Sequence, residues 1–280
     1  MIDPLHPTDA ELAVRPETGI GELRLDLARR MVAEAVGTCL LIIAVIGSGI
    51  MASRLSPDDV GLQLLENAAA TAGALIALIL MFGAVSSAHF NPIVTLVDRL
   101  LGTISMRDTA LYALAQTIGG CIGTIIANLM FELDAINVST KVRSSGALWL
   151  SEVVATVGLL LVISGCVRTG RASAVPFAVG AWIGGAYFFT SSTRFANPAG
   201  TIARTLSDTF AGIKPSSAPM FIAMQVLGAL VAYGLIRFLY PHNLSELDDD
   251  CTPPPRGAVR VCAQRRPVAD GRRTARTSRR

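Results

Sequence analysis

Charged and metal-binding side chains are scarce in this 280-residue chain. Only 16% of the residues are Asp, Glu, Lys or Arg and only three are His, whereas 51% are hydrophobic. The five cysteines show no metal-ligand spacing, and Cys39, Cys121 and Cys166 lie inside apolar runs, where we interpret them as small buried hydrophobes. This composition is typical of an integral membrane protein, and it indicates no metal centre and no cofactor.

Both ends of the chain lack long apolar segments. Residues 1–27 hold several acids and do not resemble a signal peptide, so we expect a cytoplasmic N-terminal tail. Residues 243–280 contain three consecutive prolines and an Arg-rich run, which predicts a disordered basic cytoplasmic tail. This second tail is either a solvated positively charged segment or a contact with anionic lipid headgroups. Because no aromatic residues alternate with its arginines, nucleic acid is not indicated as a partner.

Six apolar runs of about bilayer length lie between the two tails. They cover roughly residues 31–52, 67–85, 109–131, 147–167, 174–190 and 217–240. Basic residues are more numerous on the side that holds both ends of the chain, which predicts that both termini are cytoplasmic.

Two Asn-Pro pairs, Asn91-Pro92 and Asn197-Pro198, interrupt this pattern. Asn is a good helix N-cap and Pro fits the first helical turn, so each pair predicts the start of a helix. The segments that follow, roughly 92–101 and 198–207, are too short to cross a bilayer. Two half-helices inside an apolar chain indicate a pore or a binding site at mid-membrane depth.

The two halves of the chain repeat the same motifs in the same order, Glu-x-x-small-Thr, Asn-Pro and Gln-x-x-Gly. The motifs begin at Glu34, Asn91 and Gln116 in the first half, and at Glu152, Asn197 and Gln225 in the second. A unit of three spans is odd, so the second copy must enter the membrane inverted. We therefore predict an all-α membrane protein with six transmembrane helices and two re-entrant half-helices. Its channel domain would cover residues 28–242, with repeats at about 28–131 and 146–240.

These motifs resemble those of the aquaporin, or major intrinsic protein, family over roughly residues 28–240. The resemblance is carried by Ser87-Ala88-His89-Phe90-Asn91-Pro92-Ile93-Val94-Thr95, by Asn197-Pro198-Ala199 and by the paired glutamates. Ile93 is a departure, because the family usually has Ala after Asn-Pro. The resemblance implies a homotetramer in the plasma membrane, with one pore per subunit for water or small neutral solutes, and no enzymatic activity.

The chemistry of the motif residues, together with the resemblance, suggests roles for single side chains. Two helix N-termini that meet at mid-membrane would repel cations, and Asn91 and Asn197 would offer side-chain N–H groups to the solute. Glu34 and Glu152 either hold the two loops by accepting backbone N–H bonds, which we favour, or form a proton relay. His89 either packs the loop or acts as a pH-sensitive gate.

The selectivity filter departs from the family pattern. The positions that usually carry an aromatic, a His or Gly, and an Arg are Thr71, Gly185 and Gly200 here. We hypothesise that Arg194 supplies the missing guanidinium, and we expect the competing Arg204 to face the loop and the surface. Thr201 stands where glycerol-type members usually carry Asp, so glycerol is less supported, whereas hydrogen peroxide, urea and undissociated arsenous acid remain open.

Two other classes of protein remain open on the sequence. An ion-coupled secondary transporter would also use inverted repeats and broken helices, but it would need a titratable group in its pathway. A closed, structural membrane protein would result if Arg194 blocked the opening.

Overall fold

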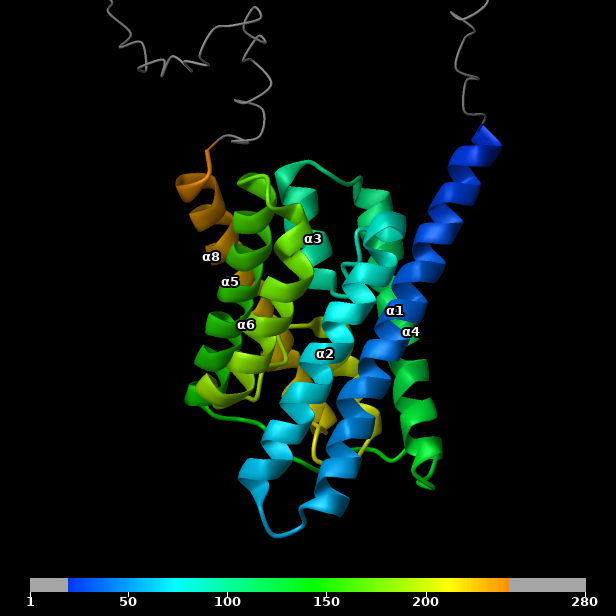
Figure 1. Cartoon of the computed structure of the whole chain (residues 1–280), viewed down its shortest axis with the longest axis vertical. Helices are drawn as coiled ribbons and strands as arrows, with labels where there is room; N and C mark the ends of the chain where they lie inside the picture. The colour runs from blue at the N-terminus through cyan, green and yellow to red at the C-terminus, as the bar shows by residue number, and fades with distance from the viewer. Residues whose placement is uncertain (1–19, 242–280) are drawn as a thin grey trace, which may run out of the picture.

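The computed structural model describes residues 20–241, with side chains from Asp26 onward. Six long helices run side by side between the two ends of the molecule (Figure 1). They are α1 (Ile20–Leu55), α2 (Val60–Ser86), α4 (Met106–Met130), α5 (Gly146–Arg168), α6 (Val175–Phe189) and α8 (Ala218–Leu239). All six, α6 together with the 3-10 turn Ala172–Ala174 before it, are long and apolar enough to cross a membrane. The predicted all-α membrane fold is confirmed.

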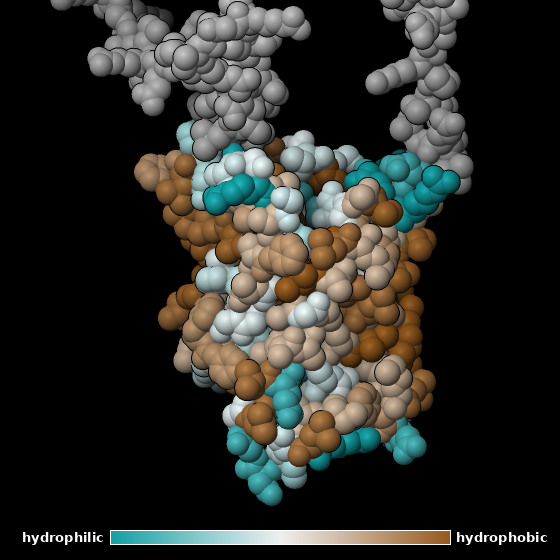
Figure 2. Space-filling view, in the orientation of Figure 1, coloured by the Kyte–Doolittle hydropathy of each residue, from teal (hydrophilic) through white to brown (hydrophobic). Residues whose placement is uncertain are grey.

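The surface is divided into bands. Hydrophobic residues form a broad middle band, and hydrophilic residues gather at the two ends of the molecule (Figure 2). Large apolar side chains such as Leu80, Phe188 and Phe238 are more than half exposed. Because water disfavours such a surface, the band fits the hydrocarbon core of a bilayer. The first turn of α1 and the last turn of α8 lie at the same end (Figure 1). Of the two expected tails, only residues 20–27 of the first lie within the described residues, and all of the second, 243–280, lies outside them.

Two spans begin earlier than the sequence predicts. Helix α1 starts at Ile20, inside the expected N-terminal tail, where Leu, Glu and Arg favour a helix. Helix α2 starts at Val60 rather than near 67, because Asp59 caps it by accepting a hydrogen bond from Leu62 N. Asn67, at the expected start, lies inside the helix, where its amide is buried and donates to Val45 O at 2.8 Å.

The two halves of the chain build equivalent units. In the first half α1 packs on α2 and α4, and in the second half α5 packs on α6 and α8. The half-helices are α3 (Pro92–Leu101) and α7 (Pro198–Ala203), and both contact α4 and α8. Helix α7 is shorter than predicted, because its last turn tightens into a 3-10 turn over Arg204–Leu206.

Glycines of the repeated Gln-x-x-Gly motif let the helices of each unit approach closely. A Cβ at Gly119 would collide with the carbonyl of Ala35 in α1, and one at Gly228 would lie 2.9 Å from Thr156 Cβ in α5. Gly123 meets the Cys39 carbonyl in the same way. Small residues at these positions therefore serve contacts within the subunit.

Candidate transport pathway

The two Asn-Pro loops meet inside the bundle. The side-chain nitrogen of Asn91 donates to Ala196 O at 2.7 Å, and that of Asn197 donates to Phe90 O at 2.8 Å. Each asparagine therefore bonds the residue just before the other asparagine, so the two half-helices face each other N-terminus to N-terminus. A carboxamide carries two N–H donors, so each side chain keeps a second donor for a solute.

Each asparagine also caps its own half-helix. Asn91 Oδ1 accepts from Ile93 N at 3.0 Å, and Asn197 Oδ1 accepts from Gly200 N at 3.1 Å. Pro92 and Pro198 occupy the first helical positions, where a missing N–H is harmless. With their oxygens engaged as caps, the amides can present only N–H groups inward. The remaining motif residues, Ile93 and Ala199, are buried at 2% and 0% exposure and pack the first turn of each half-helix.

The loops share an unusual backbone pattern. Positive φ angles of 44–68° occur at Ser87, Ala88 and Phe90, and again at Thr193, Arg194 and Ala196. These are the same three offsets from the following asparagine in both loops. A left-handed conformation costs a non-glycine residue about 1–2 kcal/mol, so each loop needs outside support.

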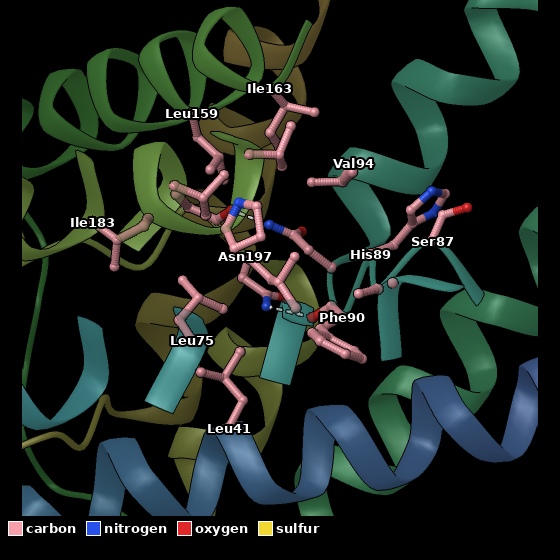
Figure 3. Close-up of a pocket in the computed structure, with 18 of the residues that line it drawn as sticks. Leu41, Leu75, Ser87, His89, Phe90, Val94, Leu159, Ile163, Ile183 and Asn197 are labelled. Carbon is pink, nitrogen blue, oxygen red and sulfur yellow. Dashed lines mark hydrogen bonds between the residues drawn. The ribbon is translucent and has the colours of Figure 1, made fainter. Parts of the chain in front are cut away.

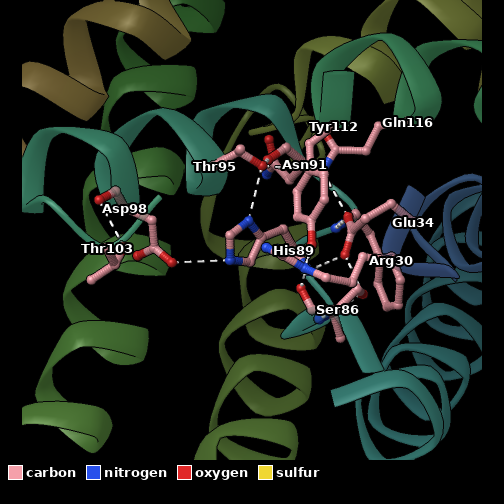
Figure 4. Close-up of polar contacts among 12 residues, drawn as sticks. Arg30, Glu34, Ser86, His89, Asn91, Thr95, Asp98, Thr103, Tyr112 and Gln116 are labelled. Carbon is pink, nitrogen blue, oxygen red and sulfur yellow. Dashed lines mark hydrogen bonds and ion pairs between the residues drawn. The ribbon is translucent and has the colours of Figure 1, made fainter. Parts of the chain in front are cut away.

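Glu34 supplies that support to the first loop. Its carboxylate accepts from the backbone N–H groups of His89 and Phe90 at 3.0 and 2.7 Å, and from the side chains of Ser86 and Gln116 at 2.6 and 2.7 Å (Figure 4). The side chain is fully buried. A buried carboxylate that accepts four hydrogen bonds anchors the loop.

Glu152 does the same for the second loop. It accepts from Phe195 N at 3.0 Å, Ala196 N at 2.8 Å and the Gln225 amide at 2.6 Å, and it too is fully buried. Gln225 also donates to Thr201, as Gln116 donates to Thr95 in the first half. These contacts support the loop-supporting interpretation of both glutamates over a proton relay.

A cavity of about 750 Å³ runs along this junction. It extends from Asp98, Thr103 and Arg168, near the ends of α3 and α5, past both asparagines to Arg194, Gly200 and Arg204. Between these ends the wall is mostly aliphatic. Figure 3 shows Leu41, Leu75, Leu159, Ile163, Ile183 and Val94 around the junction, where Asn197 and Phe90 lie. A solute there meets few polar partners, so it is not held tightly.

His89 lies in the wall on the side of Asp98. Its Nε2 is 3.0 Å from Asp98 Oδ2, and its Nδ1 is 3.0 Å from Thr95 Oγ1 (Figure 4). Its side chain is 6% exposed, and the ring also packs edge-on against Tyr112. The histidine thus joins the loop to α3 while touching the cavity, which agrees with both interpretations made from the sequence.

The four expected filter residues separate into two pairs. Arg194 and Gly200 line the cavity, whereas Thr71 and Gly185 do not. Thr71 is fully buried, and its hydroxyl lies 2.9 Å from the hydroxyl of Tyr187. Gly185 is exposed beside Phe189, on the other side of α6 from Tyr187.

Sequence reasoning missed Tyr187, whose aromatic ring lies beside Thr71 and Arg194. The Arg194 guanidinium stands 4.9 Å from the centre of its ring, so Tyr187 connects Thr71 to Arg194. The only signal in the sequence is a tyrosine directly after the small run Gly184-Gly185-Ala186.

Three buried arginines cluster at one end of the cavity, where Arg194 and Arg204 line it and Arg143 lies behind them. Arg143, Arg194 and Arg204 are 7%, 7% and 4% exposed. The expectation that Arg204 faces the surface is wrong: its guanidinium lies 3.4 Å from the Phe195 ring centre and donates to Ala211 O. The cause is tertiary, since the loop after α7 folds back over the arginine.

Arg143 reaches this cluster from the loop between α4 and α5. It donates to Gly212 O at 3.0 Å and to Ser192 O at 3.3 Å, and it lies 5.1 Å from the Phe195 ring centre. Burial lowers the pKa of Arg143 to about 10, which still leaves it protonated at neutral pH. The sequence showed it only as one of several loop charges.

Lys141 and Asp208 each help to join the loop between α4 and α5 to the loop after α7. Lys141 Nζ donates to Phe210 O at 2.9 Å, and Asp208 accepts from Thr140 N at 2.9 Å. Loss of hydration lowers the pKa of Lys141 to about 8; repulsion by Arg143 and Arg204 adds to this, and Asp208 acts the other way. The hydrogen bond from Thr140 N lowers the pKa of Asp208. Within residues 20–241 no group of three or more His, Cys, Asp or Glu could hold a metal ion.

Known proteins are similar to this chain in sequence and in fold. The family model described as Major intrinsic protein matches residues 23–193. Aquaglyceroporin AqpS of Rhizobium meliloti is 49% identical over 214 residues, which cover 76% of this chain and 91% of that protein. Probable aquaporin AqpM of Archaeoglobus fulgidus is 26% identical over 243 residues, which cover 78% of this chain and 99% of that protein.

Among solved structures, the X-ray structure of the aquaglyceroporin from Plasmodium falciparum superposes with a TM-score of 0.60. The two sequences are 19% identical, and the alignment covers 80% of this chain and 99% of that one. At this identity the likeness supports the fold alone. With the family model and the 49% identical relative, the conclusion follows that this chain belongs to the major intrinsic protein family and is a passive membrane channel for water or small uncharged solutes.

Proposed function

We propose that the channel passes small uncharged polar solutes as well as water, and that it has no enzymatic activity. The observation that carries this proposal is the reciprocal junction of Asn91 and Asn197 in the wall of an otherwise aliphatic cavity. Two relatives, from Rhizobium meliloti and Plasmodium falciparum, are named aquaglyceroporins. Their names suggest polyols as one class of solute to test.

The junction has a simple mechanism. The N-termini of α3 and α7 carry partial positive charge, so a cation meets a barrier there. The free N–H groups of Asn91 and Asn197 donate to the oxygen of a passing water or hydroxyl. That oxygen then points its own hydrogens away from the junction, which breaks the chain of hydrogen bonds that protons would follow.

We further propose that Arg194, Gly200 and Tyr187 replace the usual filter. Arg194 and Gly200 line the cavity, and Tyr187 lies beneath the guanidinium. Thr201 does not line the cavity, because its hydroxyl bonds Asn197 O and the Gln225 amide. A side chain at position 201 therefore does not contact a solute in the cavity. The Thr at this position, in place of Asp, does not argue against glycerol, which becomes a candidate again.

Stopped-flow light scattering on reconstituted vesicles tests both proposals. Vesicles with the wild type should take up water and at least one of glycerol, urea and hydrogen peroxide faster than empty vesicles. Arg194→Ser should change the ratio of solute to water flux, whereas Arg54→Ser, an exposed arginine away from the cavity, should not. Wild-type vesicles as slow as empty ones would contradict the channel, and an unchanged ratio in Arg194→Ser would contradict the filter.

The coupled-transporter alternative receives little support. Glu34 and Glu152 are fully buried and engaged with the loops, so neither is offered to the pathway. Uptake that requires a proton gradient in the same vesicles would revive it.

The location and assembly remain part of the proposal. We infer a homotetramer in the plasma membrane with both termini in the cytoplasm. The shared end of α1 and α8 supports termini on one side of the membrane, and the apolar band on the face in Figure 2 supports a multi-pass membrane protein. Chemical cross-linking in native membranes would test the tetramer.

A further inference from the structure

The cluster of Arg143, Arg194 and Arg204, at one end of the cavity, holds more positive than negative charge. Between residues 20 and 241, the ion pairs within 4.0 Å are Arg30–Asp108 and His89–Asp98, and neither involves Arg143, Arg194 or Arg204. The carboxylate beside the cluster, Glu152, already accepts three hydrogen bonds from the loop and Gln225. Buried charges are normally paired, so this excess favours a partner beyond the described residues.

Arg194 is the member of the cluster with the most free donors. Arg143 and Arg204 both donate to backbone carbonyls, but no acceptor within the described chain bonds the Arg194 side chain. Its Nε is fully enclosed and unpartnered, and the residue is only 7% exposed. The same side chain lines the cavity.

Aromatic contacts do not satisfy these donors. The Arg194 guanidinium stands over the Tyr187 ring at 4.9 Å, and such a contact uses the face of the cation. The N–H groups of a guanidinium lie in its plane and point outward from its edge. Two of these N–H groups can donate to two oxygens of one planar or tetrahedral anion, whereas the face of the Tyr187 ring offers them no acceptor in that plane.

We propose that the Arg194 end of the cavity is a binding site for a small monovalent oxyanion of the size of nitrate or formate. Arg194 would bind it through its guanidinium edge, and Arg143 and Arg204 would add positive potential without direct contact. The inference goes beyond the passage of neutral solutes. It also predicts competition, because a bound anion stands in the path that a neutral solute must take.

Nitrate is the probe of choice, because its charge does not change with pH. Purified protein is titrated with sodium nitrate by calorimetry and by thermal unfolding, with sodium gluconate at the same ionic strength as the reference, since gluconate is a much larger anion than nitrate. Arg194→Gln removes the charge without removing any hydrogen bond within the described chain, so the fold should survive. Arg54→Gln is the matched control, since Arg54, like Arg194, stands over an aromatic ring, that of Phe131, but is exposed, donates to Phe131 O and lies away from the cavity.

We expect nitrate to bind and stabilise the wild type and Arg54→Gln, with binding about tenfold weaker in Arg194→Gln. Water flux into wild-type vesicles should be lower in nitrate than in gluconate, and this difference should vanish in Arg194→Gln. Equal binding by wild type and Arg194→Gln, or no preference for nitrate over gluconate, would overturn the site. Binding without any effect on flux would overturn its place in the pathway. The flux in gluconate tests the proposed channel separately.

Discussion

Replacing Glu152 with Gln tests the view that this carboxylate holds the second loop. The change keeps the size of the side chain but exchanges one acceptor oxygen for an NH2 donor. All three partners of Glu152, namely Phe195 N, Ala196 N and the Gln225 amide, are donors. In Glu152→Gln at least one buried donor therefore faces another donor.

The magnitude follows from these three contacts. A buried N–H left without an acceptor costs about 1–3 kcal/mol, and a hydrogen bond to a charged group contributes about 1.5–3 kcal/mol against about 1 for a neutral one. One unsatisfied donor, together with one bond weakened from charged to neutral, gives a loss of about 3 kcal/mol in the free energy of unfolding. The strained backbone of Arg194 and Ala196 then loses its support.

The assay is thermal unfolding of purified protein in detergent, monitored by size-exclusion chromatography after heating. Glu132→Gln is the control, because Glu132 is exposed and lies at the end of α4, outside both loops. Glu152→Gln should unfold at a clearly lower temperature than the wild type, and the control should not. If Glu152→Gln and Glu132→Gln both unfold at the wild-type temperature, Glu152 does not support the loop, and a proton relay becomes a candidate role for it again.

Three further predictions concern packing, charge and pH. Gly119→Ala should destabilise the protein through a clash with the Ala35 carbonyl, while Gly73→Ala, which meets nothing within 4 Å, should not; equal melting temperatures would refute the close packing. The pKa of Lys141 is about 8 in the folded state, below its ordinary value of 10.5. Protonation of this lysine therefore lowers the free energy of unfolding. Stability should thus rise between about pH 8 and 10.5, less so in Lys141→Gln, and identical slopes in a melting series would refute this. If His89 is a gate, water flux should differ between pH 5.5 and 7.5 in the wild type but not in His89→Gln, and a flux insensitive to pH in the wild type would exclude it.

The half-helices and their supports could be predicted because the reasons for them are local. Asn followed by Pro favours the start of a helix, and a carboxylate in an apolar helix needs donors nearby. The repeated motifs predicted that Glu34 and Glu152 would accept N–H bonds from the loops before Asn91 and Asn197, but not that Gln116 and Gln225 would donate to the same carboxylates. The structure brings each of these sets together.

The filter region could not be predicted in this way, because it depends on which side of a helix faces inward. Counting from the asparagines reached Gly185, yet two positions further along α6 it is Tyr187 that turns toward Thr71 and Arg194. A displacement of two residues rotates a side chain by more than half a turn of a helix, since one turn takes 3.6 residues.

The sequence by itself determined the membrane fold, its inverted repeat and the pair of facing helix ends, because apolar length, capping and repetition are properties of neighbouring residues. Only the tertiary structure decided that Arg143 and Arg204 come together around Phe195, with the buried Arg194 beside them over Tyr187. These arginines belong to separate loops, and their positions depend on how those loops fold over the end of α7. Charges that look solvated along the chain thereby become a buried, positively charged cluster at the end of the cavity.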